Sequence, residues 1–468
     1  MASRPSPQRD LTNGPVAATL FAFALPSLGV NILQSMNGSV NAIWVGRFLG
    51  ERALAATSNA GMIMFLMFST LFGFAMATTI LIGQAVGRRD VDTVRRTIGS
   101  AMGMFAIAGV ATASLGWVFA PQLLRLLATP ADAYPLALSY LRVIFLGMPL
   151  SFVGILLSSS LRGVGDSMTP LWNTILNVAL DVALNPLFIL GFGPIPAMGI
   201  AGSALATLVA GIISTAFLIR KIYANDLTIR LRGPELSYLT PRATVAKPIF
   251  LMGLPMGLSM IIMSVSALAM IGLVNREGVD TTAAFGVMNQ LWSYVQMPAV
   301  AVGGAVSAMA AQNIGAGKWD RINRVAIAGV GINIAMTVTL VLLIMLAGRL
   351  LIGLFVTGDS PAIPIAVHMH RVVGWTFIPM GVSIVLMSIM RANGVVVFPL
   401  LSLIFSAVIV RFAVGFGLHP VYGAEAIWWA FVAGSVSSIL LTTAYYLHGG
   451  WRAPKAVFGF GANNPLRP

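Results

Sequence analysis

The segment Thr169–Gly191, TPLWNTILNVALDVALNPLFILG, is mostly apolar and is long enough for an α-helix to cross a lipid bilayer. Within it, Asn173, Asn177, Asp181 and Asn185 recur at every fourth position. Side chains four residues apart lie on one face of an α-helix, so these four form a polar stripe. A carboxylate inside a membrane span is costly, so we expect Asp181 to move ions or substrate. The alternative interpretation is that the stripe joins helices by hydrogen bonds.

The composition of the whole chain indicates a polytopic membrane protein. Its 468 residues are 57% apolar and only 9% charged, whereas a soluble domain has about 25% charged residues. The net charge is +14, which we attribute to the cytoplasmic bias of Lys and Arg beside membrane spans rather than to a nucleic-acid partner. The chain has no cysteine, which excludes disulfides, thiolate metal sites and cysteine nucleophiles.

Twelve apolar segments predict twelve transmembrane helices, because an isolated segment can satisfy its backbone hydrogen bonds in lipid only as a helix. The segments are about 16–44, 54–80, 97–120, 136–160, 169–191, 199–221, 246–274, 282–310, 325–348, 365–389, 398–418 and 425–447. The predicted fold class is therefore an all-α polytopic membrane protein. Its predicted parts are a tail (1–15), an N-lobe of six helices (16–221), a linker (222–245), a C-lobe of six helices (246–447) and a second tail (448–468).

The distribution of basic residues predicts the orientation in the membrane. If the N-terminus is cytoplasmic, twenty of the 28 Lys and Arg residues fall in cytoplasmic segments. Basic residues concentrate on the cytoplasmic side of membrane proteins, so we expect both tails and the linker to be cytoplasmic. The expected location is the plasma membrane, as a multi-pass protein of a bacterial inner membrane.

The two halves of the chain repeat each other. Four landmarks recur at an almost constant interval along the chain: Pro26 and Pro255, Gln84 and Gln312, Arg142 and Arg371, Arg162 and Arg391. Six spans per repeat give both halves the same orientation, related by an axis along the membrane normal. This organisation is typical of transporters, and we expect no enzymatic activity and no catalytic residue.

At these landmarks the chain resembles the multidrug and toxic compound extrusion (MATE) family of cation antiporters. The similar segments, in chain order, are LPSLGVNILQSMNGSVNAIWVGRFLGERALAA (25–56), GQAVGRRD (83–90), LRGVGDSMTP (161–170) and LNVALDVALNPLFILGFGPIPAMGIAGSALAT (176–207). The resemblance implies a V-shaped bundle of two six-helix lobes. It also implies that the protein exports amphipathic, often cationic, drugs in exchange for inward-moving H⁺ or Na⁺.

The resemblance also implies roles for individual residues. Asp181 and Asn177 match the family's acidic cation-coupling site in the N-terminal lobe, and Pro26 matches the first-helix proline, where the helix is thought to bend. The family usually has a second acid where this chain has Asn41. The seventh and tenth spans contain no acid, although some branches have one there. We therefore expect proton coupling through Asp181, with Na⁺ as the alternative ion, and no cofactor or resident metal.

Comparison of the two halves suggests where substrate binds. In the first span, Asn31, Gln34, Asn37 and Asn41 form a polar stripe, and their counterparts, at the interval from Pro26 to Pro255, are Met260, Met263, Ser266 and Met270. Methionine is flexible and polarizable, which suits promiscuous apolar surfaces, although ordinary helix packing explains it as well. The residues predicted to line the substrate cavity are Gln34, Asn31, Asn37, Asn173, Met256, Met260 and Met263.

The proposed mechanism is alternating access in which Asp181 binds a proton or a cationic substrate, but not both. Arg411 also lies deep in a span; we favour a structural role for it, paired with a carboxylate or reaching toward an interface. If it faces the cavity instead, we expect the substrates to shift toward neutral or anionic compounds. The expected partners are small amphipathic or cationic compounds and the bilayer, with the protein as a monomer. The alternatives are a sodium-coupled antiporter and a flippase for lipids or lipid-linked oligosaccharides. The Gly163–Asp166 sequence GVGD matches a protease motif but lacks its second acid.

Overall fold

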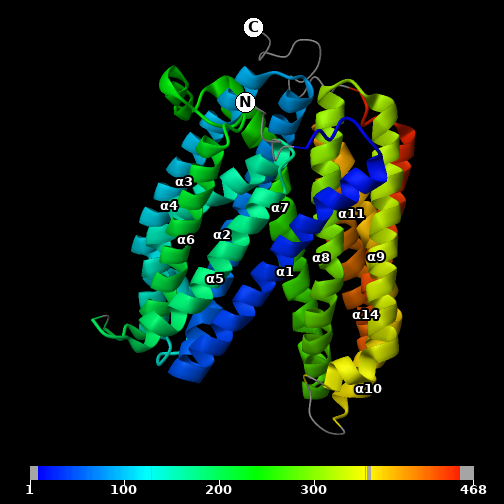
Figure 1. Cartoon of the computed structure of the whole chain (residues 1–468). Helices are drawn as coiled ribbons and strands as arrows, with labels where there is room; N and C mark the ends of the chain where they lie inside the picture. Colours follow the sequence, from blue (N-terminus) through cyan, green and yellow to red (C-terminus); the bar gives the residue numbers. More distant parts are fainter. Residues whose placement is uncertain (1–8, 128, 195, 354, 356–359, 454–468) are drawn as a thin grey trace. The chain divides into compact units, whose positions relative to one another are not determined.

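The computed structural model describes residues 9–127, 129–194, 196–353, 355 and 360–453. Within these ranges every element of regular secondary structure is helical, and twelve spans are long and apolar enough to cross a membrane (Figure 1). The prediction of an all-α polytopic fold with twelve spans is thereby confirmed.

The contacts within the chain divide it into two compact units. Unit 1 contains Gly29–Gly253 together with the start of the described chain as far as Asp10. Unit 2 contains Leu11–Leu28 and the chain from Leu254 onward. The divisions after Leu28 and after Gly253 fall inside long helices, α1 and α7, so each of these helices contributes one end to each unit.

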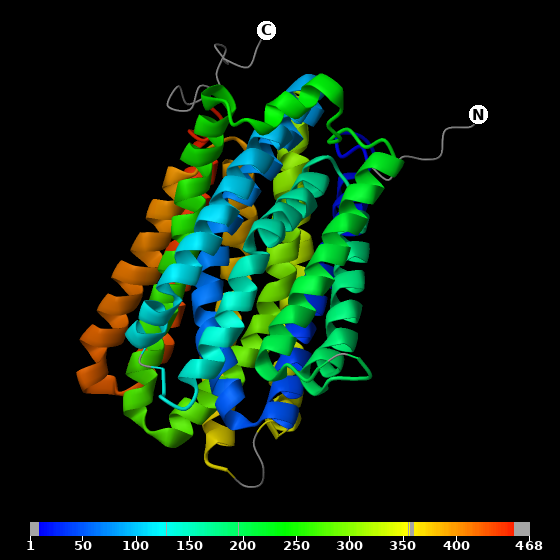
Figure 2. The same ribbon diagram turned by 90° about the vertical axis from the view of Figure 1, so that its left-hand side faces the viewer.

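Unit 1 is built from the first six spans. Its helices are α1 (Val16–Leu49, from Gly29), α2 (Glu51–Gly87), α3 (Val91–Leu126), α4 (Tyr134–Gly163), α5 (Met168–Leu190), α6 (Gly199–Ala224), the 3₁₀ helix η1 (Gly233–Leu239) and the first part of α7 (Ala243–Val274). Within the unit, α4 packs against α2, α3 and α6, and α5 packs against α6 (Figure 2).

Unit 2 repeats this packing with the last six spans. Its helices, after the remainder of α7, are η2 (Asn275–Glu277), α8 (Val279–Gly315), α9 (Trp319–Gly353), α10 (Ala362–Val373), η3 (Gly374–Thr376), α11 (Phe377–Ala392), α12 (Val397–Ile404), η4 (Phe405–Val410), α13 (Arg411–Tyr422) and α14 (Ala424–His448). Here α11 packs against α8, α9 and α14, and α13 packs against α14. These pairs correspond one for one to those around α4 and α5.

The helices extend beyond the apolar segments that predicted them. The third segment, predicted as 97–120, is helical over Val91–Leu126. Backbone hydrogen bonds hold a helix together whatever its side chains are, so it continues past the edge of the hydrocarbon region. The start of α3 is set by Asp90, whose carboxylate accepts a 2.9 Å hydrogen bond from the backbone N–H of Thr93.

Two spans expected to be continuous α-helices are interrupted. The tenth changes to a 3₁₀ turn at Gly374–Thr376, between α10 and α11. Pro379 follows this turn; it has no N–H to donate to the carbonyl one turn earlier, which favours a local change of helix type. The eleventh contains a π-helical turn at Phe405–Val410. A π-turn takes up one extra residue, which the apolar pattern alone does not reveal.

The motif LRGVGDSMTP forms the turn that starts α5. The carboxylate of Asp166 is fully buried and accepts hydrogen bonds from the backbone N–H groups of Met168 (3.0 Å) and Thr169 (2.9 Å). Gly165 adopts the left-handed region (φ +90°), where its carbonyl accepts a 3.1 Å hydrogen bond from the backbone of Arg9. Asp166 is therefore a structural cap, which agrees with rejecting the protease interpretation.

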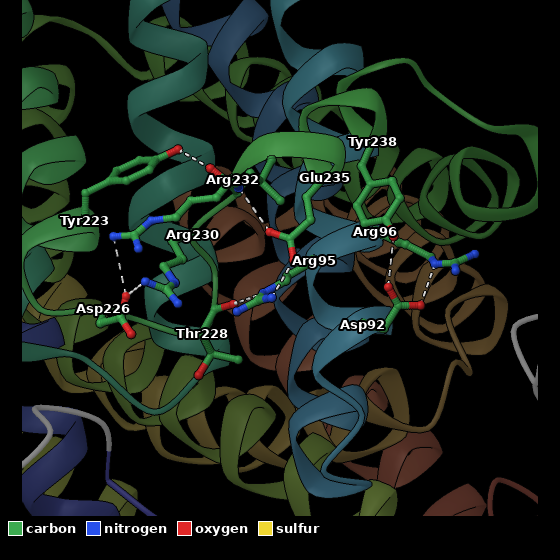
Figure 3. Close-up of polar contacts among 11 residues, drawn as sticks. Asp92, Arg95, Arg96, Tyr223, Asp226, Thr228, Arg230, Arg232, Glu235 and Tyr238 are labelled. Carbon is green, nitrogen blue, oxygen red and sulfur yellow. Dashed lines mark hydrogen bonds and ion pairs between the residues drawn. The ribbon is translucent and has the colours of Figure 1, made fainter.

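The linker between the two halves (222–245) is bound to α3 of unit 1 by ion pairs and hydrogen bonds (Figure 3). Arg95 of α3 forms an ion pair with Glu235 of η1, with an N···O distance of 2.5 Å. Asp92 pairs with Arg96 and accepts a 3.0 Å hydrogen bond from Tyr238. Gly99 of α3 leaves room for this linker, because a Cβ there would lie 2.6 Å from the Cβ of Tyr238.

In unit 2, Leu11–Asn13 are bound by the end of α8 and the start of α9. Leu11 is fully buried, and its backbone carbonyl accepts a 3.0 Å hydrogen bond from Asn313. The Lys318 ammonium lies 2.9 Å from the Thr12 carbonyl and 2.8 Å from Asn13 Oδ1. These contacts anchor the segment that leads into α1.

Candidate functional site

Asp181 lies in the middle of α5 and is only 1% exposed. Its two carboxylate oxygens are held by donors from three helices. Oδ2 accepts from Asn37 Nδ2 at 2.9 Å and, more weakly, from Asn41 Nδ2 at 3.5 Å, both on α1. Oδ1 accepts from Thr207 Oγ1 of α6 at 3.0 Å and from Asn185 Nδ2, one turn along α5, at 3.2 Å. All five residues belong to unit 1.

A second layer of contacts orients these donors. Ser203 Oγ of α6 donates to Asn41 Oδ1 at 3.2 Å, which turns the amide of Asn41 so that its Nδ2 points at Asp181. Asn185 Nδ2 also donates to the backbone carbonyl of Asp181 at 2.9 Å. Both amides therefore have a second partner besides the carboxylate oxygens.

No Lys or Arg forms an ion pair with Asp181 in the part of the chain that the structure describes. Its partners are amides and a hydroxyl, which stabilise a carboxylate without neutralising it. A carboxylate without a fixed counter-ion can bind a proton or a cation in turn. This is the property that an exchange site requires.

The site also presents oxygens that are not used within the protein. Asn37 Oδ1 and Asn185 Oδ1 are buried and have no hydrogen-bond partner in the described structure. Both belong to residues whose amide nitrogens contact Asp181. Hard cations prefer such carboxylate and amide oxygens as ligands.

The two amides predicted for cation coupling differ in whether they contact Asp181. Asn41 lies beside Asp181, as its prediction requires. Asn177 lies one turn before Asp181, but its Nδ2 donates to Ser214 Oγ of α6 at 2.9 Å. Asn37, which we assigned to the substrate cavity, makes the shorter of the two α1 contacts to Asp181.

Sequence reasoning did not assign Asn185, Thr207 or Ser203 to the site. Asn185 belongs to the polar stripe of α5, so its four-residue spacing from Asp181 could have predicted that it lies beside the carboxylate. Thr207 and Ser203 lie on α6, where small polar residues are common and their spacing carries no distinctive pattern. Only the packing of α6 against α5 identifies them.

The remaining predicted polar residues lie at varied depths. Gln34 of α1 is exposed, and Asn31 and Asn173 are half-buried. Asn173 Oδ1 is buried without a partner in the described structure. Pro26 is buried in unit 2, and α1 continues through it without a break. Their roles in binding substrate and in bending stay predictions.

The methionines predicted to line the cavity differ in exposure. Met256 is buried, with 4% of its surface exposed, whereas Met260 is 38% exposed and Met263 is half-buried. All three lie on the part of α7 that belongs to unit 2. Met260 and Met263 are therefore accessible enough to contact a ligand, and Met256 serves packing in this structure.

Comparison with known proteins agrees with the repeat and the fold. A family model described as MatE matches twice, at residues 26–187 and 255–416. The two matches have the same length, and the second begins at Pro255, the counterpart of Pro26. This agreement confirms the internal repeat.

The chain is similar along most of its length to curated bacterial proteins. It is 34% identical over 434 residues to "Probable multidrug resistance protein YoeA" of Bacillus subtilis (strain 168), covering 91% of this chain and 92% of that one. It is 29% identical over 446 residues to "Probable multidrug resistance protein YpnP" of the same organism, covering 95% and 98%. Among solved structures, the outward-facing conformation of a multidrug resistance MATE family transporter of the MOP superfamily matches with a TM-score of 0.86. That match has 19% identity and covers 94% of this chain and 97% of that chain.

Proposed function

This chain belongs to the MatE family of membrane transporters, and from that premise we propose that it exports amphipathic, often cationic, compounds in exchange for protons. The observation that carries the proposal is the environment of Asp181: a buried carboxylate, held by amide and hydroxyl donors and with no cationic partner in the described structure. Two relatives carry the name "Probable multidrug resistance protein", and these names support the class of substrate.

The exchange follows from competition for one carboxylate. A proton that enters from outside neutralises Asp181 and releases the cationic substrate bound there. Loss of the proton to the cytoplasm restores the charge, and the next substrate binds. The membrane potential contributes about 2.3 kcal/mol per charge for each 100 mV to this inward proton movement.

Coupling to conformation runs through α1 in this proposal. Asn37 and Asn41 donate to Oδ2 of the charged carboxylate, and protonation of Oδ2 makes it a donor and weakens it as the acceptor of these two bonds. The part of α1 around Asn37 and Asn41 then loosens from α5, and the helix bends at Pro26, which has no N–H to donate to the carbonyl one turn earlier. The two lobes alternate between inward and outward access as α1 changes its packing.

Sodium is the second candidate for the coupling ion, and one observation favours it. The unpartnered oxygens Asn37 Oδ1 and Asn185 Oδ1 sit on residues that contact Asp181, so a cation near the carboxylate would find further oxygen ligands. Proton and sodium coupling use the same carboxylate and differ in whether these amide oxygens take part.

The test is transport of a fluorescent lipophilic cation into everted vesicles, with a pH gradient and a sodium gradient imposed separately. We expect the native chain to respond to the pH gradient and Asp181→Asn to respond to neither. The matched control is Asp132→Asn, which removes a carboxylate whose side chain is 70% exposed and which should transport as the native chain does. Gradient-driven transport by Asp181→Asn at the native rate contradicts the proposal; a response to sodium alone selects the second candidate.

We further propose that the protein works as a monomer in the bacterial inner membrane. Both tails and the linker are cytoplasmic in this proposal, because Lys and Arg concentrate in those segments. The absence of cysteine makes this easy to test, since a single introduced cysteine reports its own accessibility. The positions for Ser237→Cys in the linker and Asp280→Cys at the start of α8 are both exposed. In intact cells we expect an impermeant maleimide to label only Asp280→Cys; the opposite pattern would invert the topology.

A further inference from the structure

Arg411 is a guanidinium inside the eleventh span that has no counter-ion in the described structure. Its Nη1 donates to Ser266 Oγ of α7 at 3.4 Å, and its Cζ lies 4.7 Å from the ring centroid of Phe431 of α14. Its Nε is buried and has no acceptor among the described residues. No Asp or Glu of that part of the chain pairs with it, so the expected structural carboxylate partner is not found there.

The contact with Ser266 is the repeat of the contact that Asn37 makes with Asp181. Ser266 is the counterpart of Asn37, because the two are separated by the interval that separates the starts of the two family-model matches (26 and 255). In unit 1 this position of α1 donates to Asp181. In unit 2 the same position of α7 accepts from Arg411, because the Ser266 hydroxyl donates to the carbonyl of Ala407 and leaves its lone pairs free.

The π-turn before Arg411 explains how it takes the place of Asp181. By the repeat interval alone, the counterpart of Asp181 is Val410, and Arg411 is one residue too far. The π-helical turn Phe405–Val410 takes up one extra residue. Arg411 therefore has the angular position around the helix axis that Val410 would have in an uninterrupted α-helix. Arg411 therefore stands on its helix where Asp181 stands on α5.

The third partner is also repeated. The last span of each unit supplies it: α6 in unit 1 and α14 in unit 2. Thr207 of α6 donates to Asp181, and Phe431 of α14 packs against Arg411. Each unit thus holds a charged side chain among three corresponding helices: Asp181 among α1, α5 and α6 in unit 1, and Arg411 among α7, α13 and α14 in unit 2.

The neighbours of Arg411 favour a ligand that combines an anionic group with an aromatic ring. Removing a guanidinium from water without a counter-ion is costly, and the cost is recovered when an anion binds. Its planar fork of N–H groups matches a carboxylate in two parallel hydrogen bonds. The residue is only partly buried, and Phe431 offers an aromatic face beside the charge.

We propose that Arg411 is a substrate-binding residue and that it takes the carboxylate of aromatic amphiphiles that carry one. This rests on the proposed function, because it assigns a second recognition group to the same transporter. It extends the substrates from simple cations to compounds that also carry a carboxylate.

The test uses two probes that differ by one group: a rhodamine with a free carboxylate and its methyl ester, which is a simple cation. Their binding to the purified full-length protein is followed by fluorescence anisotropy, and their transport is measured in proteoliposomes. The variants are Arg411→Gln, Arg411→Lys and, as the matched control, Arg349→Gln, which removes an exposed arginine of unit 2.

We expect Arg411→Gln to weaken binding of the carboxylate probe about tenfold or more, or about 1.4 kcal/mol, because a charge-assisted bidentate contact is lost. Binding of the ester should stay within about twofold. Arg411→Lys should restore part of the loss, and Arg349→Gln should change neither probe. Melting temperatures of all variants establish that they are folded.

Equal binding of the carboxylate probe by folded native and Arg411→Gln proteins would overturn the inference, as would equal weakening of both probes. Displacement of the carboxylate probe by chloride at the concentration where acetate displaces it would also overturn it, because the site would then be one for small inorganic anions. Failure of the native protein to transport the ester contradicts the proposed function instead, so the two failures are distinguishable.

Discussion

Asn37 donates a hydrogen bond of 2.9 Å to Asp181, although 144 residues separate them in the chain. This contact joins α1 to α5 through Asp181. Asp181 is a buried carboxylate inside a span, and its partners are amides and a hydroxyl. It links the ionic state of Asp181 to the position of α1, and the first prediction tests that link.

Substitution of Asn37 should impair coupled transport more than substitution of Asn41. The contact of Asn37 with Oδ2 is 2.9 Å long, whereas that of Asn41 is 3.5 Å, at the limit of a hydrogen bond. A hydrogen bond to a charged group contributes about 1.5 to 3 kcal/mol, so we expect Asn37→Ala to slow gradient-driven transport about tenfold or more, and Asn41→Ala to slow it less. The measurement is initial rate in vesicles at matched protein levels; the reverse order of the two variants would count against the role of Asn37.

Asn177 should act together with Ser214 rather than with Asp181. Its amide donates to Ser214 Oγ at 2.9 Å, and a neutral hydrogen bond of this kind contributes about 1 kcal/mol. We expect Asn177→Ala and Ser214→Ala to lower the melting temperature by similar amounts, and the double variant to lower it little further. Additive losses would show that Asn177 has another partner. A loss of proton coupling in Asn177→Ala but not in Ser214→Ala would support the predicted role of Asn177 in cation coupling.

The linker should lose stability at acid pH through Glu235. The backbone N–H of Arg232, which donates to Glu235, holds the pKa of this carboxyl below its ordinary value, and the Arg95 guanidinium acts in the same direction. A lowered pKa in the folded state means that the stabilisation is complete above the ordinary pKa and is lost as the pH falls through the folded value.

We therefore expect native protein to be more stable than Glu235→Gln at about pH 7, and the difference to shrink as the pH is lowered below about 4. The measurement is the melting temperature in detergent, or proteolysis at the linker. The control is Asp132→Asn, whose exposed carboxylate makes only a 3.8 Å contact with Arg52. A difference between native and Glu235→Gln that does not change with pH would contradict this assignment.

Leu11 should be an anchor of unit 2 although it lies ahead of the first span. It is fully buried, and Gln312, Asn313 and Lys318 hold the backbone beside it. Replacing a buried leucine by alanine costs about 2 to 5 kcal/mol, so Leu11→Ala should lower the melting temperature clearly. Leu25→Ala, at a leucine that is 45% exposed, is the matched control and should have a small effect. Equal melting temperatures for the two variants would show that the segment is not anchored.

The sequence predicted the helical class, the number of spans and the repeat because these depend on regular local patterns. An apolar run of bilayer length forms a helix wherever it occurs, since its backbone has no other partner in lipid. The ends of the helices were less predictable, as in α3, because the backbone hydrogen bonds that extend a helix do not depend on apolar side chains. The π-turn at Phe405–Val410 was not predictable, because nothing in an apolar run marks where one extra residue is accommodated.

The site shows the same division between local pattern and tertiary contact. The sequence by itself determined that a carboxylate, Asp181, lies deep in the fifth span, and that Asn185 shares its face, because helical spacing fixes both. Only the tertiary structure decided that Asn37 and Thr207 hold that carboxylate while Asn177 turns to Ser214, since these contacts depend on how α1 and α6 pack against α5. Only the tertiary structure placed Arg411 at the equivalent position of unit 2, because a change of helix type, which has no signature in the sequence, rotates it there.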